Sequence, residues 1–140
     1  MPRRASVGAE LRENVDDVLF TDCDVIHDKG REWTLRVYHC DSARITNVRF
    51  ENLRIEESPR LISLWIDKAF WSRDEQRGHI EGVVFRDISA PPPARIELKG
   101  FDAEHAIENV LLHNVTVGGE ALEASAIRAN KFVRSVTVSQ

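Results

Sequence analysis

The acidic residues Asp67 and Glu97 lie in stretches where apolar and polar residues alternate, residues 60–67 and 95–99, a pattern typical of β-strands. Neighbouring strands lie about 4.8 Å apart, so stacked strands would place the two carboxylates roughly 5 to 9.5 Å apart. An acid and a nucleophile or base at that separation can cleave a glycosidic bond. The alternative is proximity by chance, because the chain holds 23 acidic residues. We treat Asp67 and Glu97 as candidate catalytic residues.

Aromatic and charged side chains near the same stretches suit the recognition of a sugar. A sugar ring needs an apolar surface against its C–H side and polar or charged groups for its hydroxyls. The alternatives are a solvated sheet face with cross-strand ion pairs and a loop whose aromatic residues fold back over the core. The candidate substrate-binding residues are Tyr38, Trp65 and Lys99, expected to point outward from strands, and Trp71, Arg73 and Asp74, in the loop of residues 68–78.

The composition argues against several other classes of function. The 19 basic and 23 acidic residues give a formal charge of −4, and no basic strip interleaved with aromatic residues marks a nucleic-acid surface. The five histidines show no metal-ligand spacing, and the phosphate-binding and serine-hydrolase motifs are missing. No apolar run approaches the ~20 residues of a membrane span, and residues 1–8 lack the apolar stretch of an export signal. We expect no metal, no cofactor, no nucleic-acid partner and no membrane partner.

One eight-residue motif occurs five times and determines the expected architecture. Its copies begin at residues 15, 45, 80, 107 and 133, with apolar residues at the first, fourth and sixth positions. The fourth and sixth positions alternate as in a strand, so stacked copies would align their apolar side chains in a continuous interior. A second strand is expected after each of the first four copies, at residues 33–39, 60–67, 95–99 and 121–128.

These features predict an all-β solenoid, a right-handed, single-stranded parallel β-helix with about four to five coils. We assign residues 14–140 to this domain and residues 1–13 to an N-terminal extension or cap, with a helix expected near residues 9–14. Cys23 falls in an apolar column, so we expect both Cys23 and Cys40 to be free thiols.

The eighth motif position holds mostly short polar side chains. We expect them to bond backbone amides from coil to coil where the chain turns. The residues of this column are Asp22, Asn52, Asp87, Asn114 and Gln140.

Three stretches resemble the later coils of a known enzyme family. They are residues 47–55 (Asn-Val-Arg-Phe-Glu-Asn-Leu-Arg-Ile), 61–66 (Leu-Ile-Ser-Leu-Trp-Ile) and 71–80 (Trp-Ser-Arg-Asp-Glu-Gln-Arg-Gly-His-Ile). They are similar to polygalacturonase-like enzymes of glycoside hydrolase family 28 and their pectin-lyase-like relatives, over roughly residues 14–140. The resemblance implies a pectin-lyase-like β-helix, hydrolysis of O-glycosyl bonds in a polysaccharide by two carboxylates, and an extracellular origin.

The catalytic motifs of that family occur here as fragments. Residues 16–17 (Asp-Asp), 78–80 (Gly-His-Ile) and 95–97 (Arg-Ile-Glu) match parts of its Asp-Asp, Gly-His-Gly and Arg-Ile-Lys motifs, and its Asn-Thr-Asp motif has no counterpart. Two functions stay open: a carbohydrate-active module of the glycoside hydrolase type, and a non-catalytic sugar-binding or assembly module or inactive fragment of a larger enzyme. The expected partners are a polysaccharide or oligosaccharide and further copies of the chain, joined through exposed ends of the β-helix.

Overall fold

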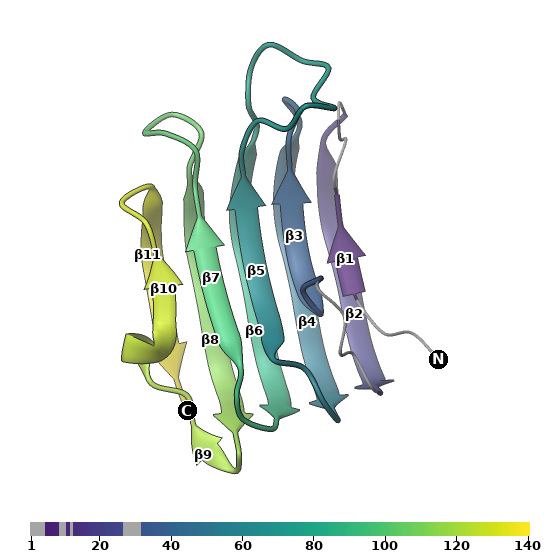
Figure 1. Ribbon diagram of the computed structural model, residues 1–140, viewed down its shortest axis with the longest axis vertical. Helices are drawn as coiled ribbons and strands as arrows, with labels where there is room; N and C mark the ends of the chain where they lie inside the picture. Colours follow the sequence, from purple (N-terminus) through teal and green to yellow (C-terminus); the bar gives the residue numbers. More distant parts are fainter. Residues whose placement is uncertain (1–4, 9–10, 12, 27–31) are drawn as a thin grey trace.

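The computed structural model describes residues 5–8, 11, 13–26 and 32–140, which form two alternating sets of strands (Figure 1). One set contains β1 (Ala5–Val7), β3 (Leu35–His39), β5 (Arg60–Ile66), β7 (Arg95–Lys99) and β10 (Ile127–Ala129). The other contains β2 (Val15–Val25), β4 (Arg44–Ile55), β6 (His79–Ala90), β8 (Ile107–Val117) and β11 (Val133–Ser139). The remaining elements are β9 (Glu120–Ala121) and a 3-10 helix, η1 (Ala124–Ala126).

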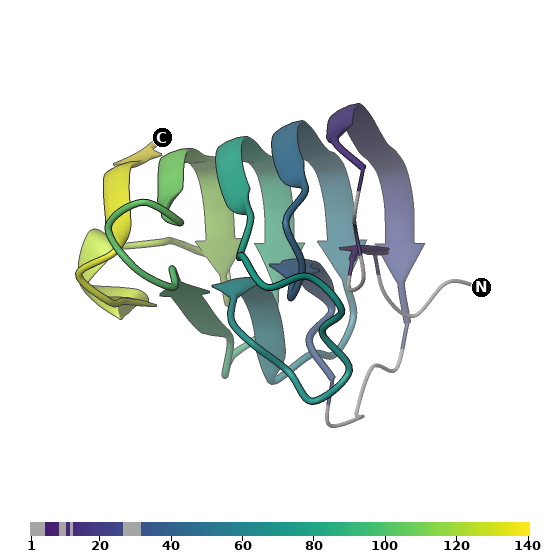
Figure 2. The same ribbon diagram turned by 90° about the horizontal axis from the view of Figure 1, so that it is seen from above.

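Each set forms its own parallel sheet, so the chain winds as a parallel β-helix of about four turns. The strand order is β1-β3-β5-β7-β10 in what we call the front sheet and β11-β8-β6-β4-β2 in the back sheet. Figure 2 shows the strands of the back sheet curved around the interior, with the front strands on the opposite side. The all-β, parallel β-helical fold expected from the repeat is confirmed.

Two residues in each of the first four copies of the motif, and one in the fifth, have a left-handed backbone conformation and bend the strands of the back sheet. In β4 they are Asn47 and Asn52, both with φ 55°, at the third and eighth motif positions. Apolar side chains are two or three residues apart along the motif, and each interval of three contains one such residue. The extra residue lets the strand turn while the next apolar side chain still points inward, as in a β-bulge. The equivalent residues elsewhere are Asp17, Asp22, Gly82, Asp87, Asn109, Asn114 and Ser135.

Side chains at the eighth position bond to each other in two pairs of coils, where we expected bonds to backbone amides. The Asn52 amide donates a hydrogen bond to the Asp22 carboxylate, and the Asn114 amide donates one of 2.9 Å to Asp87. Equivalent side chains on neighbouring coils stack about 4.8 Å apart, so an amide directly meets the carboxylate of the next coil. The alternation of Asp and Asn along this column therefore links coils in pairs.

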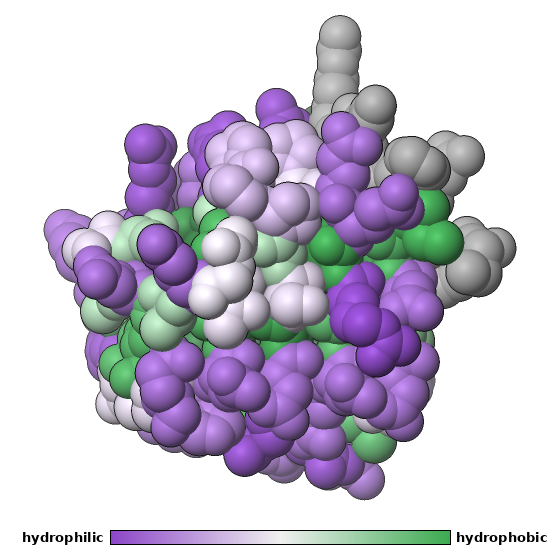
Figure 3. Space-filling view, turned by 90° about the horizontal axis from the view of Figure 1, so that it is seen from below, coloured by the Kyte–Doolittle hydropathy of each residue, from purple (hydrophilic) through white to green (hydrophobic). Residues whose placement is uncertain are grey.

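The core lies between the two sheets and is filled by the aligned apolar columns. The rings of Phe20, Phe50 and Phe85 stack, with centroids 5.0 Å apart in each contact. Val48 and Val83 are neighbours in the adjacent column and are fully buried. Seen from below, hydrophobic residues form a band across the middle of the molecule, bordered by hydrophilic residues (Figure 3). The fourth and sixth motif positions thus build the core.

The terminal strands of the back sheet are less buried than the central ones. Among the described strands, β2 and β11 are the two edge strands of the back sheet, and each pairs with one neighbouring strand. Their motif residues Phe20 and Val136 are only half-buried. Association of chains through these ends stays a prediction, which sedimentation velocity at micromolar concentration tests.

The last of the expected second strands is shorter than predicted and lies nearer the C-terminus. It forms as β10 rather than over residues 121–128 and pairs in parallel with β7, because the chain first turns back after β8 at Gly118 and Gly119, where β9 pairs with β8 in antiparallel fashion. Within residues 1–13, β1 pairs in parallel with β3, and the helix expected near residues 9–14 lies largely outside the described residues. Both cysteines are free, as expected. In the described part of the chain, no helix has the length and apolar character to cross a membrane.

Candidate functional site

Side chains of β3, β5 and β7 form two rows across the outer face of the front sheet. They alternate along each strand with buried apolar residues, so they point away from the core. One row contains Tyr38, Trp65 and Lys99, and the other contains Arg36, Ser63 and Glu97.

A groove of about 370 Å³ lies over these rows. Its walls include all three tryptophans of the chain, Trp33, Trp65 and Trp71, and its single tyrosine, Tyr38. The phenylalanines of the motif instead stack in the core. The aromatic residues that combine an apolar ring with a polar N–H or O–H are therefore concentrated at one surface site. The other lining residues are Glu32, Arg36, Ser63, Leu64, Glu97 and Lys99.

The aromatic side chains of the groove are oriented by their neighbours. The centroids of the Tyr38 and Trp65 rings lie 5.7 Å apart, with the ring planes tilted by 47°. The Arg36 guanidinium lies 4.5 Å from the Tyr38 ring centroid, and the Arg95 guanidinium lies 5.6 Å from that of Trp33. Both distances are within the range of cation–π attraction. These contacts hold ring faces in place before a ligand binds.

The charged groups around the groove form ion pairs. Such partly exposed pairs contribute only about 0–1 kcal/mol each to stability, so their main effect is on the electrostatic field of the groove. The pairs, with their nitrogen–oxygen distances, are Arg36 with Glu32 (2.5 Å), Arg95 with Glu97 (2.6 Å) and Lys99 with Asp67 (3.7 Å).

Asp67 and Glu97 do not lie opposite one another, which corrects the separation assumed from the sequence. The register pairs Trp65 of β5 with Lys99 of β7. Glu97 lies two residues before Lys99, and Asp67 lies two residues after Trp65. Four residues correspond to about 13 Å along a strand. Register depends on the packing of the inward side chains, which alternation alone does not specify. Glu97 lines the groove and Asp67 does not; a catalytic role for the two carboxylates stays a prediction.

The loop of residues 68–78 is anchored by a buried carboxylate. Asp41 is fully buried and accepts hydrogen bonds from the backbone N–H groups of Arg73, at 2.7 Å, and Asp74, at 2.8 Å. Burial raises the pKa of Asp41, but the amides of Asp74 and Arg73 and the charge of Arg77 outweigh burial, so the pKa of Asp41 lies below its ordinary value. The ionised carboxylate thus fixes the loop at the edge of the groove.

Of the three loop residues predicted to bind substrate, Trp71 lines the groove. Asp74 instead accepts hydrogen bonds from the Ser42 backbone N–H, at 3.1 Å, and from the Ser42 hydroxyl, at 2.6 Å. Arg73 is exposed and lies outside the lining residues. In this structure Asp74 therefore helps to position the loop, and substrate contacts by Arg73 and Asp74 stay predictions.

Gly78 lies where the end of this loop passes too close to the preceding coil for a side chain. A Cβ atom there would be 2.1 Å from the Ala43 carbonyl oxygen and 2.3 Å from Nε2 of His39. The buried His39 ring contacts the same carbonyl through Nε2 at 2.7 Å. The neighbouring Arg77 is also buried and donates to the Cys40 carbonyl. Packing between two coils therefore explains the glycine of the Gly-His fragment seen in the sequence.

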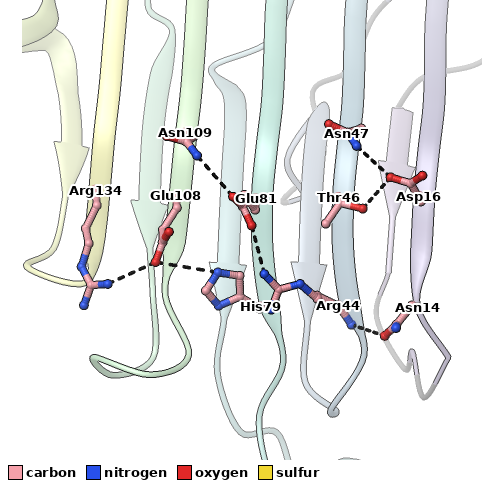
Figure 4. A network of polar contacts seen from close by, with 10 residues as sticks. All are labelled: Asn14, Asp16, Arg44, Thr46, Asn47, His79, Glu81, Glu108, Asn109 and Arg134. Atoms are coloured by element: carbon pink, nitrogen blue, oxygen red, sulfur yellow. Dashed lines mark hydrogen bonds and ion pairs between the residues drawn. The ribbon is translucent and has the colours of Figure 1, made fainter.

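A second polar region lies at the start of the back strands, where side chains are linked from coil to coil (Figure 4). The Glu108 carboxylate lies 3.1 Å from Arg134 and 3.8 Å from His79. The Glu81 carboxylate accepts a hydrogen bond of 3.0 Å from Arg44. These contacts run across neighbouring strands, so they join the coils laterally.

The N-terminal end of this network is centred on Asp16. Its carboxylate accepts hydrogen bonds from the Thr46 hydroxyl, at 2.5 Å, and the Asn47 amide, at 2.8 Å. These two bonds, that of Thr46 first, hold the pKa of Asp16 below its usual range. A hollow of about 270 Å³ beside the network has no aromatic wall other than histidine; its lining residues are Asn14, Ser42, Arg44, Arg77, Gly78, His79, Glu104 and His105. We assign this region a structural role.

The chain matches no protein-family model and no curated protein. A function is therefore inferred from the groove itself.

Sequence reasoning missed part of the groove. Of the predicted residues, Tyr38, Trp65, Trp71, Glu97 and Lys99 line it, whereas Asp67, Arg73 and Asp74 do not. The lining residues that were not singled out as site residues are Glu32, Trp33, Arg36, Ser63 and Leu64. The confinement of tryptophan and tyrosine to positions in or near two successive front strands, β3 and β5, was the signal that could have identified Trp33.

Proposed function

We propose that the groove over the front sheet binds a segment of a polysaccharide or an oligosaccharide. The observation that supports this function is the location of all three tryptophans and the single tyrosine around one groove. Flat aromatic faces cover the apolar C–H side of a sugar ring, and the polar N–H and O–H edges remain available for its hydroxyls. Clusters of this kind are rare on a surface that serves only to be solvated.

The polar lining of the groove complements the hydroxyl groups of a sugar. Arg36 and Lys99 supply N–H donors, Glu97 supplies carboxylate acceptors, and the Ser63 hydroxyl can do both. These side chains lie on neighbouring strands, and ion pairs with Glu32 and Asp67 already orient Arg36 and Lys99, which reduces the conformational entropy lost when they contact a ligand. The groove is therefore preorganised for an extended polar ligand.

A second candidate function is hydrolysis of a glycosidic bond, favoured by the presence of Glu97 among the lining residues. Glu97 is half-buried and accepts a hydrogen bond from Arg95. In this proposal Glu97 acts as one carboxylate of an acid–base pair and Asp67 as the other, brought together by substrate and side-chain movement. The register offsets Glu97 and Asp67 by four residues along the strands, and Asp67 does not line the groove, so binding is the function that the geometry supports better.

Affinity electrophoresis through gels containing pectins, glucans or galactans tests the binding proposal. We expect retardation of the wild-type chain by at least one polymer and its loss in Trp65→Ala. The matched control is Leu19→Ala, because Leu19 is exposed on the back sheet, away from the groove. No retardation by any polymer, or equal retardation of wild type and Trp65→Ala, would contradict the proposal.

Release of reducing ends from the same polymers tests hydrolysis separately. If Glu97 and Asp67 act together, both Glu97→Gln and Asp67→Asn abolish release while retardation in the gel persists. Binding without release in the wild type would leave the groove as a binding site and exclude hydrolysis of those polymers.

A further inference from the structure

We propose that the groove selects an uncharged glycan over one that bears carboxylate or sulfate groups. This inference rests on the proposed sugar-binding function and concerns the class of sugar. Four ionisable acidic and basic side chains line the groove, the carboxylates Glu32 and Glu97 and the cations Arg36 and Lys99. Their formal charges sum to zero, whereas a groove suited to an anionic polymer presents an excess of cations.

Both cations of the groove already face a carboxylate of the protein. Nη1 of Arg36 lies 2.5 Å from Oε2 of Glu32, and Nε of Arg36 donates to the Ser6 hydroxyl at 2.9 Å. Nζ of Lys99 lies 3.7 Å from Oδ2 of Asp67. Guanidinium groups bind an incoming carboxylate best through two parallel N–H donors, and two donors of Arg36 are engaged within the protein. An anionic sugar would have to compete with Glu32 and Asp67 for the same cations.

Glu97 adds a negative group to the lining of the groove. Its Oε1 accepts a hydrogen bond of 2.6 Å from Arg95, whose guanidinium lies over the Trp33 ring. Arg128 lies opposite Glu97 in the β7–β10 register, outside the lining residues. A carboxylate or sulfate in the groove would therefore approach the like charges of Glu97 and Glu32, which lowers affinity.

A neutral sugar can use the same groups without a change in net charge. One hydroxyl can donate to Glu97 and accept from Arg36 or Lys99, because a hydroxyl is both donor and acceptor. The Tyr38 and Trp65 rings cover the C–H face of the sugar at the same time. The ion pairs can then persist in the complex, and no buried charge is left without a partner.

The test compares neutral and uronate oligosaccharides of the same linkage and length, namely galacturonan fragments with methyl-esterified and with free carboxyl groups, by isothermal titration calorimetry at low ionic strength. The double variant Glu32→Gln/Glu97→Gln removes both groove carboxylates and releases Arg36 and Arg95 from their partners. Asp67→Asn releases Lys99 alone. The matched control is Glu120→Gln, an exposed carboxylate on β9 outside the groove.

We expect the wild type to bind the neutral fragment about tenfold more tightly than the uronate. In the double variant, the ratio of the affinities for the neutral and the uronate fragment should shift about tenfold toward the uronate, and high salt should abolish this gain. Asp67→Asn should shift the ratio of affinities in the same direction. Tighter binding of the uronate by the wild type, or an unchanged ratio in the double variant, would overturn the inference. Binding of neither class by the wild type would instead overturn the proposed function.

Discussion

Tyr38 and Trp65 are direct cross-strand neighbours on β3 and β5, and their ring centroids lie 5.7 Å apart. The parallel register of a β-helix places equivalent positions of successive coils side by side, so a surface residue on one coil acquires a fixed neighbour on the next. The two rings thereby form a continuous aromatic surface along the groove. This arrangement gives the fold a direct role in the proposed recognition of sugar.

Replacement of Tyr38 should weaken sugar binding through loss of this surface. Tyr38→Ala removes the partner of Trp65 and the ring beneath Arg36. An aromatic contact contributes about 0.5–1.5 kcal/mol beyond area burial, so we expect a decrease in affinity of about fivefold. Tyr38→Phe keeps the ring and should stay within about twofold of the wild type. Calorimetric titration with the retarding glycan measures both, and equal losses in the two variants would show that the ring is not the binding element.

A side chain at residue 78 should destabilise the fold. Gly78→Ala places a Cβ atom 2.1 Å from the Ala43 carbonyl oxygen, so the loop or the preceding coil must shift, at a cost of about 2 kcal/mol. Gly119→Ala is the control, because nothing lies within 4 Å of its Cβ position and only the strain of its positive φ of 79° applies. Urea unfolding measures the two free energies. A cost below about 1 kcal/mol for Gly78→Ala would contradict the close approach of the coils at Gly78.

Two substitutions of Asn52 that remove the same hydrogen bond should differ in stability, because Asn52 has a left-handed backbone conformation. Asn52→Ala and Asn52→Gly both lose the amide that donates to Asp22, but only alanine keeps a Cβ atom at φ 55°. The alanine variant should therefore be less stable than the glycine variant by about 1 kcal/mol in thermal or urea unfolding. A glycine variant as unstable as the alanine variant would mean that backbone strain is not significant at this corner.

The stability of the fold should depend on the ionisation of Asp41. The pKa of Asp41 is lower in the folded state than its ordinary value. The ionised carboxylate therefore contributes fully to stability above the pKa of Asp41 in the unfolded state, about 3.9. This contribution is lost as the pH falls through the pKa of Asp41 in the folded state. Asp41→Asn should cost about 2 kcal/mol at pH 7, because two amides lose a charged acceptor.

The control for this prediction is the pH dependence itself. In urea unfolding between pH 7 and pH 2, the difference between wild type and Asp41→Asn should narrow as the pH falls, because protonation makes the two side chains alike in charge. A difference that stays constant over this range would contradict the ionic role of Asp41.

The coil could be predicted from the repeat, because the apolar or polar character of the residues at each motif position indicates whether their side chains are buried. Phe50 and Phe85 occupy the same position in successive copies and stack in the core. The outward direction of Tyr38 and Trp65 followed from the same alternation, since Val37 before Tyr38, and Leu64 and Ile66 on either side of Trp65, are apolar and buried. Local periodicity was therefore sufficient to predict which side chains face the core and which of them form much of the groove.

Features that depend on contacts between coils were not predictable in the same way. The offset between Asp67 and Glu97 is determined by the register of β5 and β7, which includes a shift between Arg60 and Ile62. Trp33 lies before the start of β3, outside the segment in which side chains alternate as in a strand. Its place in the groove could therefore not be derived from the alternation of apolar and polar residues alone. Register and the paths of connecting segments require the three-dimensional packing.

Intrinsic tryptophan fluorescence tests the central claim most directly, because all three tryptophans of the chain line the groove. Titration with a retarding oligosaccharide should change the emission and protect it from quenching by acrylamide, with saturation at the affinity found by calorimetry. Both changes should be lost or strongly reduced in Trp65→Ala. Saturable binding by calorimetry with unchanged emission and unchanged quenching would place the sugar elsewhere and contradict the assignment of the groove.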